Sequence, residues 1–171
     1  MENNVFALRA SVRDFLPDEV PQELIEQLLH AATQAPSAGN LQPWHFYVVK
    51  KTALKEQLSA CAYGQKSIAS APVVIVVCAE PAMSSKRYEA RGETLYCLQD
   101  TAAATENILL CAAQNGLGTC WCGAFKEEAV SQAMALPAAR RPVAILPIGY
   151  PAKPAKKPAR RPMKDTVTTI E

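Results

Sequence analysis

Two arginines and a serine near the start of the chain are spaced for binding a phosphate group. Arg9, Ser11 and Arg13 alternate with small apolar residues in the segment RASVR. On an extended backbone alternate side chains point to the same side, so these three would face one way. Each guanidinium offers fork-shaped N–H donors that match phosphate oxygens, and the hydroxyl adds another donor. The pattern predicts a phosphate clamp; a solvated N-terminal face would carry the same residues.

A second segment, APSAGNLQPWHFY at 35–47, places a loop of small polar residues before a cluster of aromatics. Its Ser, Asn and Gln side chains offer hydroxyl and amide groups from a backbone that Pro36, Gly39 and Pro43 hold in a turn. Such a loop can read the polar edge of a flat heterocycle. It can equally be an ordinary connector, with Trp44 and Phe46 as core residues.

A third segment, NGLGTCWCGAF at 115–125, has glycines that would let a ligand approach the backbone closely. It follows a predicted helix instead of opening one, so it does not match the dinucleotide fingerprint, and neither GxxxxGK[ST] nor GxSxG occurs in the chain. His30 and His45 have no carboxylate pattern near them, so we expect neither a metal site nor a histidine triad. Cys120 and Cys122 are not spaced as a standard redox pair and are expected to be structural.

Length and composition predict one domain with a sizeable core, since the chain has 171 residues of which 49% are apolar. A net charge of +2 is too small to make nucleic acid or an anionic membrane the main partner. With no apolar run long enough for a membrane span and no signal-peptide pattern, a cytoplasmic location is expected. The irregularly spaced cysteines are expected to be reduced and mostly buried.

Hydrophobic patterning predicts the elements that hold these segments. Residues 71–79 form a continuous β-branched run, typical of a central strand covered on both faces. Residues 94–114, rich in Ala and Leu, predict a long buried helix. The polar stretch 81–93 has weak periodicity and predicts a loop or mobile flap. The other expected elements are a helix at 21–33 ended by the Pro36 to Gly39 loop, a strand at 44–49, a short helix capped by Thr52, a short strand or extended turn at 118–125, a surface helix at 126–136 and a last internal strand at 142–150.

The C-terminal segment differs from the rest of the chain. Residues 151–171 carry an excess of Lys and Arg, and the prolines of PAKPAKKPARRPMKD exclude a packed helix. The final residues, VTTIE, have the composition of a strand. We therefore predict a domain at 1–150 and an extended basic arm at 151–171, whose terminal strand could cross to a neighbouring subunit and add to its sheet.

Taken together and in order, several segments resemble the nitroreductase family of FMN-dependent oxidoreductases. These are RASVRDF, APSAGNLQPWHFYVV, APVVIVV, DTAAATENILLCAAQNGLGTCWCGAF and ALPAARRPVAILPIGYP, which span nearly the whole chain. The specific part is R-x-S-x-R-x-F near the start followed by P-S-x-x-N-x-Q-P-W. The resemblance implies an α+β, three-layer fold with a mixed central β-sheet flanked by helices. It also implies an intertwined homodimer with an exchanged C-terminal arm and two FMN sites at the interface.

The resemblance also implies roles for individual residues. At the phosphate and ribityl end of FMN it places Arg9, Ser11 and Arg13, completed by a basic residue of the arm that is either Arg160 or Arg161. Around the isoalloxazine ring, from the second subunit, it places Pro36, Ser37, Ala38 and Asn40, with Gln42 nearby. A backbone N–H at Cys122 or Gly123 would contact the flavin N5. Trp44 and Phe46 would anchor the loop to the sheet.

The implied activity is a ping-pong reaction carried by the flavin. NADPH or NADH would deliver hydride to N5 and leave, and a nitroaromatic, quinone or similar acceptor would then take two electrons. No side-chain acid or base is required, and the sequence names neither the preferred donor nor the acceptor. Larger members carry a longer excursion than 81–93, so a more open site is expected here; Tyr88 and Arg91 could touch substrate or be solvated.

Three other functions stay open. The same fold could bind or store FMN with little turnover, or could serve a specialised flavin-dependent dehydrogenase or dehalogenase. The short 81–93 segment argues against the specialised enzyme because no dedicated lid is visible. A basic-tailed nucleic-acid binder is a further alternative, but KPAKKPARRP has no interleaved aromatic residues.

Overall fold

The computed structural model describes residues 4–171. Its strands are β1 (Trp44–Val49), β2 (Val73–Ala79), β3 (Gly118–Thr119) and β4 (Arg141–Gly149). Its helices are α1 (Val5–Leu8), α2 (Gln22–Thr33), α3 (Thr52–Cys61), α4 (Lys66–Ser70), α5 (Pro81–Arg91), α6 (Cys97–Gln114) and α7 (Glu127–Ala133). Short non-α turns are η1 (Ala38–Asn40), η2 (Gly92–Tyr96, a π-helical turn) and η3 (Met163–Asp165). In this described part of the chain, no helix is long and apolar enough to cross a membrane.

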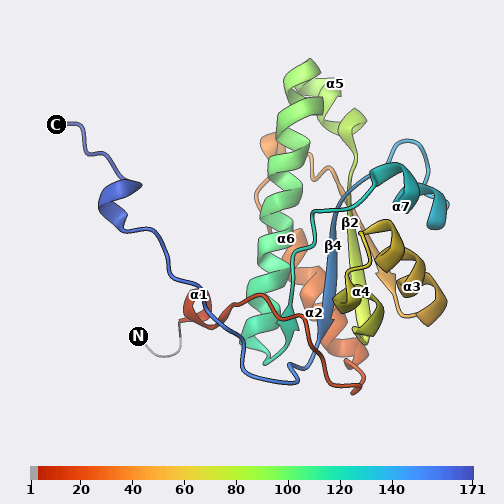
Figure 1. Cartoon of the computed structure of the whole chain (residues 1–171). Helices are drawn as coiled ribbons and strands as arrows, with labels where there is room; N and C mark the ends of the chain where they lie inside the picture. The colour runs from red at the N-terminus through yellow and green to blue at the C-terminus, as the bar shows by residue number, and fades with distance from the viewer. Residues whose placement is uncertain (1–3) are drawn as a thin grey trace.

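Strand β2 lies at the centre of three layers, as its unbroken apolar sequence predicts. All seven of its residues are buried. Its alternate side chains enter two separate cores on the two faces of the sheet. One core, against α2 and α6, receives Val73, Ile75 and Val77; the other, against α3, α4 and α7, receives Val74, Val76 and Cys78. Figure 1 shows the long helix α6 on one side of β2 and β4, with α3, α4 and α7 on the other.

The sheet has the strand order β1-β2-β4-β3, and each of these neighbouring pairs is antiparallel. The N-terminal segment runs alongside β3 in the same direction and adds one isolated parallel bridge to the sheet, between Ser11 and Thr119. The predicted α+β, three-layer architecture is confirmed. Of the predicted mixed sheet, the four strands supply only antiparallel pairs, and the Ser11–Thr119 bridge supplies the parallel one. The predicted major elements also form, including the central strand at β2 and the long helix at α6.

The predicted loop at 81–93 is wrong. This stretch forms α5 and then η2, which continues directly into α6. Pro81 stands at the first helical turn, where its missing N–H costs nothing. The helix is exposed on most sides and therefore has no apolar stripe, which is why periodicity did not reveal it. The predicted cap of α3 is also wrong, because Lys51 and not Thr52 is its N-cap. The short helices α1 and α4 were not predicted.

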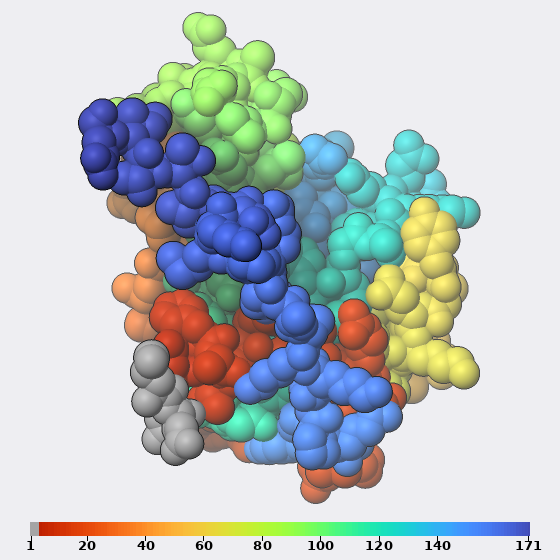
Figure 2. All heavy atoms as spheres, turned by 60° about the vertical axis from the view of Figure 1, so that its left-hand side comes forward, coloured from red at the N-terminus to blue at the C-terminus, as the bar shows by residue number. Residues whose placement is uncertain are grey.

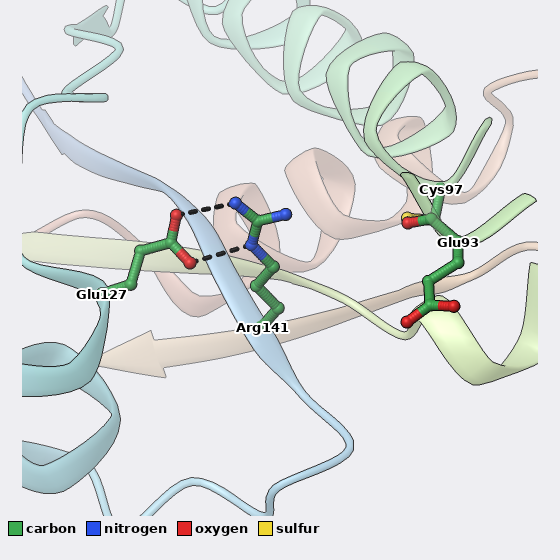
Figure 3. Close-up of polar contacts among 4 residues, drawn as sticks. All are labelled: Glu93, Cys97, Glu127 and Arg141. Carbon is green, nitrogen blue, oxygen red and sulfur yellow. Dashed lines mark hydrogen bonds and ion pairs between the residues drawn. The ribbon is translucent and has the colours of Figure 1, made fainter. Parts of the chain in front are cut away.

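An ion pair fastens α7 to the start of β4. Arg141 Nε and Nη2 donate to Glu127 Oε2 and Oε1 at 2.8 and 2.9 Å, and Figure 3 shows the guanidinium directed towards this carboxylate. The hydrogen bond from Arg141 lowers the pKa of Glu127. Because both side chains are nearly half exposed, solvent screens the pair, and it stabilises the fold by no more than about 1 kcal/mol.

Residues 151–171 leave the body as an extended arm. Figure 1 shows the chain running from the end of β4 past α1 to a distant C-terminus. The last five residues, 167–171, form no strand in the single chain. Their predicted pairing with a neighbouring subunit stays a prediction.

Candidate functional site

The segment RASVR has the extended geometry that the phosphate clamp requires. Arg9 follows α1 with extended backbone angles, φ −61° and ψ 126°. The Val12 N–H donates to the Thr119 carbonyl at 2.8 Å, which attaches the segment to β3. Val12 is buried, whereas Ser11 and Arg13 on either side of it are exposed. The alternation therefore turns the apolar side chain towards β3 and the polar ones outward.

The clamp residues line a cavity of about 480 Å³ between the N-terminal segment and the arm. Three cationic side chains of the arm join them there, so that five cationic side chains and one hydroxyl surround the space. The lining residues are Phe6, Ala7, Arg9, Ala10, Ser11, Arg13, Lys156, Lys157, Pro158 and Arg160. The Glu106 carboxylate lies beside one of these cations, with its Oε1 3.9 Å from Arg9 Nε. The donor set fits a phosphate dianion.

The path of the arm explains which of its two adjacent arginines reaches the cavity. The arm first pairs with the N-terminal segment: Leu16 N–H donates to the Tyr150 carbonyl at 2.8 Å, and Ala152 N–H donates to the Asp14 carbonyl at 3.0 Å. Figure 2 shows the arm continuing beside the N-terminal segment. Arg160 then lines the cavity, whereas Arg161 Nη2 donates to the carbonyl of Asp165 at 2.8 Å. The structure thus distinguishes two residues that the sequence left equivalent.

Two buried thiols lie beneath the clamp. A hydrogen bond with the Cys122 thiol lowers the pKa of Cys120 against the opposing effect of burial, and the charge of Arg13 and a hydrogen bond with Ser11 lower it further. The same contact and burial raise the pKa of Cys122. Both side chains belong to the core on the α3, α4 and α7 side, as the structural interpretation predicted. All six cysteines are free, and most are buried, as expected.

The backbone of Cys122 is already paired. Its N–H donates to the Ile145 carbonyl and its carbonyl accepts from the Ile145 N–H, both at 3.0 Å. The N–H of Gly123 takes part in none of the hydrogen bonds found within residues 4–171. Of the two backbone donors proposed for the flavin, Gly123 therefore has the N–H that can still be donated.

The loop that follows α2 is held in an unusual shape by its own side chains. Gly39, Asn40 and Gln42 all have positive φ, at 60°, 55° and 52°. The Gln42 N–H donates to Ser37 Oγ at 2.9 Å, and the Gln42 side-chain amide contacts Asn40 Oδ1 at 3.3 Å. Left-handed backbone in residues other than glycine is costly and persists where the surroundings impose it. The loop is therefore built for a particular shape, beyond what a connector needs.

A buried carboxylate on α6 fixes the middle of this loop. Asp100 Oδ1 accepts a hydrogen bond from the Ala38 N–H at 3.1 Å, although Asp100 is only 7% exposed. Its other oxygen, Oδ2, is buried without a hydrogen-bond partner in the described chain. Burial raises the pKa of Asp100, and the Ala38 hydrogen bond opposes that shift. The sequence offered one signal for this residue, because it is one of two acids, with Glu106, in an Ala-rich helix. We did not predict its role.

Replacing Asp100 with asparagine is expected to change how stability depends on pH. The raised pKa means that the folded state holds the Asp100 proton more tightly than the unfolded state does. The wild-type free energy of unfolding therefore falls as pH rises from about 4, the ordinary aspartate pKa, through the raised value. Asp100→Asn keeps an acceptor for Ala38 and removes the ionisation. Urea unfolding is measured for both proteins at pH 4 to 8. The free energy of unfolding of the variant should rise relative to that of the wild type as pH rises, by on the order of 1 kcal/mol. A difference that does not change with pH would contradict the assignment.

The loop and the cavity contact different parts of α6. Ala38 is tied to Asp100, whereas Arg9 lies near Glu106. Six residues of helix separate the two contacts by about 9 Å along the axis and place them on different faces. None of Pro36, Ser37, Ala38, Asn40 or Gln42 lines the cavity within the single chain.

Comparison with known proteins shows the family to which the chain is similar. The family model described as the nitroreductase family matches residues 7–67 and 53–150. A protein of Archaeoglobus fulgidus, named as a candidate NADH dehydrogenase/NAD(P)H nitroreductase, is 38% identical over 148 residues, covering 84% of this chain and 81% of that protein. A solved structure from Clostridium acetobutylicum, named as a candidate NADH oxidase, is 33% identical with a TM-score of 0.83, covering 98% of this chain and 99% of that one.

The fold is shared more widely than the sequence. A nitroreductase family protein of Streptococcus pneumoniae is only 20% identical, yet superimposes with a TM-score of 0.90 over 97% of this chain and 98% of its own. The residues matched by the family model begin before the phosphate clamp and end after β4. Because the family model matches nearly all of residues 7–150 and a relative is 38% identical over 84% of the chain, the chain belongs to the nitroreductase family.

Proposed function

We propose that this chain is an FMN-dependent oxidoreductase that oxidises NADH or NADPH and reduces nitroaromatic, quinone or similar acceptors. The observation that carries the proposal is the cavity where Arg9, Ser11, Arg13 and Arg160 converge from opposite ends of the chain. Such a concentration of guanidinium groups around one space suits a phosphate monoester. The names of the relatives support a nicotinamide electron donor.

In this proposal the chain's residues bind and orient the cofactor. Arg9, Arg13 and Arg160 hold the phosphate, and Ser11 contacts the phosphate or ribityl chain. When bound, FMN supplies the two-electron exchange between the nicotinamide and the acceptor. We expect donor and acceptor to use one site in turn, which gives ping-pong kinetics.

We further propose that two copies of the chain complete each site. In a homodimer the loop 36–42 would come from the partner subunit and line the flavin ring, with the Gly123 N–H near N5. The exposed apolar residues of the arm support this arrangement: Met163, Val167 and Ile170 are 77%, 56% and 92% exposed in the single chain. Burying these side chains against a second copy would release apolar surface from water.

A visible absorption spectrum of freshly purified protein tests the function most directly. We expect a yellow protein that bleaches under anaerobic NADH or NADPH, recovers its colour with a quinone, and releases FMN, identified by mass, in about one copy per chain. A protein that stays yellow with both nicotinamides would instead support an FMN-binding role without turnover. A colourless protein that refuses added FMN would refute the cofactor assignment.

A further inference from the structure

The segment α5–η2 holds two arginines against two tyrosine rings. The Arg87 guanidinium lies 5.4 Å from the centre of the Tyr88 ring, and that of Arg91 lies 5.3 Å from the centre of the Tyr96 ring. Arg91 Nε also donates to Tyr96 Oη at 2.9 Å. The two rings meet edge to face, with centres 5.1 Å apart. We name these four residues the Arg–Tyr cluster; cation–π contacts orient both of its guanidiniums.

The positive charge of this cluster has no carboxylate partner within residues 4–171. The ion pairs in that part of the chain engage Arg9, Arg140, Arg141 and Lys153, but neither arginine of the cluster. Arg87 also donates none of the side-chain hydrogen bonds found there. A guanidinium with uncommitted N–H edges matches the two oxygens of a carboxylate. The cluster therefore presents oriented donors suited to an oxyanion.

The Arg–Tyr cluster packs directly on the loop after α2. A Cβ atom added at Gly39 would lie 2.7 Å from Tyr88 Oη and 2.8 Å from Arg87 Nη1, so the polar ends of both side chains lie directly against the loop at this residue. Asp100 holds the same loop through the neighbouring residue, Ala38. Under the proposed function this loop lines the flavin ring, where the substrates bind in turn. Arg87 would then lie at the wall of the substrate site, away from the arginines assigned to the cofactor phosphate.

The backbone of this segment is strained at the cluster. Glu89, between the two arginines, has φ 49° and ψ −139°, a conformation that a residue with a side chain rarely adopts. The following turn, η2, is π-helical. Both features are costly in themselves and are found preferentially at functional sites.

We propose that Arg87 and Arg91 recognise a carboxylate on a planar aromatic acceptor, so that this protein prefers anionic acceptors over neutral ones. The inference rests on the proposed function. Tyrosine rings beside the guanidiniums suit an aromatic body, and the guanidiniums suit its carboxylate. In each turnover with a nitroaromatic acid, NAD(P)H and one proton reduce the nitro group to a nitroso group, and NAD(P)⁺ and water are released.

The test uses the FMN-loaded protein and its Arg87→Gln, Arg91→Gln and Lys86→Gln variants. Lys86→Gln is the matched control, because it removes the same charge next to the cluster without belonging to it. Binding to the oxidised protein is measured calorimetrically with benzoate and with benzamide, which carries no charge. Loss of one charge-assisted contact should weaken the binding of benzoate by about tenfold or more in each arginine variant. The affinity for benzamide should change by less than about twofold. The Lys86→Gln variant should bind both compounds as the wild type does.

Turnover provides the second readout. The ratio of kcat/KM for 4-nitrobenzoate to that for nitrobenzene should fall by about tenfold in Arg87→Gln, with Arg87→Lys intermediate because it keeps the charge and loses the fork. The proposal is overturned if benzoate binds equally to all variants. It is also overturned if only the preference for NADPH over NADH changes, since the guanidiniums would then serve the donor's phosphate. Failure to bind FMN, or to bleach with NAD(P)H, would refute the proposed function instead.

Discussion

Arg13→Ala is expected to raise the dissociation constant of FMN by about 10- to 100-fold, because it removes a charged donor from the phosphate group. Arg13 lies on the exposed side of the segment attached to β3 and lines the cavity with Arg9 and Arg160. Its removal leaves the buried side of that segment, where Val12 contacts β3, unchanged. The measurement is a titration of flavin-free protein with FMN, in which the fluorescence of FMN is expected to be quenched on binding.

The two arginines of the arm supply an internal control for this experiment. Arg160→Ala should weaken FMN binding in the same way, since Arg160 lines the cavity. Arg161→Ala should weaken it by less than about twofold, because Arg161 is engaged with the Asp165 carbonyl and retains only a screened, long-range effect. Equal losses in Arg160→Ala and Arg161→Ala would show that the cavity does not select between them. An unchanged affinity in Arg13→Ala would refute the clamp.

The fold could be predicted where the signal is local. The unbroken apolar run of β2 is visible in the sequence because the strand is covered on both faces. The alternating burial of RASVR was predictable for a similar reason, since alternation along an extended segment is fixed by backbone geometry. In contrast, α5 is exposed on most sides, and a helix without an apolar stripe leaves no periodic pattern.

Contacts between distant segments could not be predicted. The bond between Ala38 and Asp100 joins residues 62 positions apart and depends on how α6 packs beside the loop. The choice between Arg160 and Arg161 depends on the path of the arm along the N-terminal segment. The commitment of the Cys122 N–H to Ile145 depends on strand pairing. Each of these follows from tertiary packing, which residue types alone do not specify.

Packing beneath the clamp leads to the second large effect, which we expect for Gly118→Ala. A Cβ atom at Gly118 would lie 2.7 Å from Val12 Cβ and 2.8 Å from each of its methyl carbons. Carbon atoms prefer separations of about 3.5 to 4.0 Å, so Val12 must move by roughly one ångström. Ser11 and Arg13 flank Val12 and would move with it. We therefore expect FMN affinity to fall by about tenfold or more and the free energy of unfolding by about 1–3 kcal/mol.

A double-mutant cycle separates this mechanism from general damage to the fold. Val12→Ala deletes two of the three carbon atoms that the new methyl group would meet. Val12→Ala in the Gly118→Ala background should therefore recover part of the FMN affinity, whereas Val12→Ala alone should lose stability through a small cavity. Additive losses in the double variant would mean that Gly118 and Val12 act independently. A loss of stability with unchanged FMN affinity would mean that the position of Val12 does not set the position of the clamp, and that Arg13 can reach the phosphate from more than one backbone arrangement.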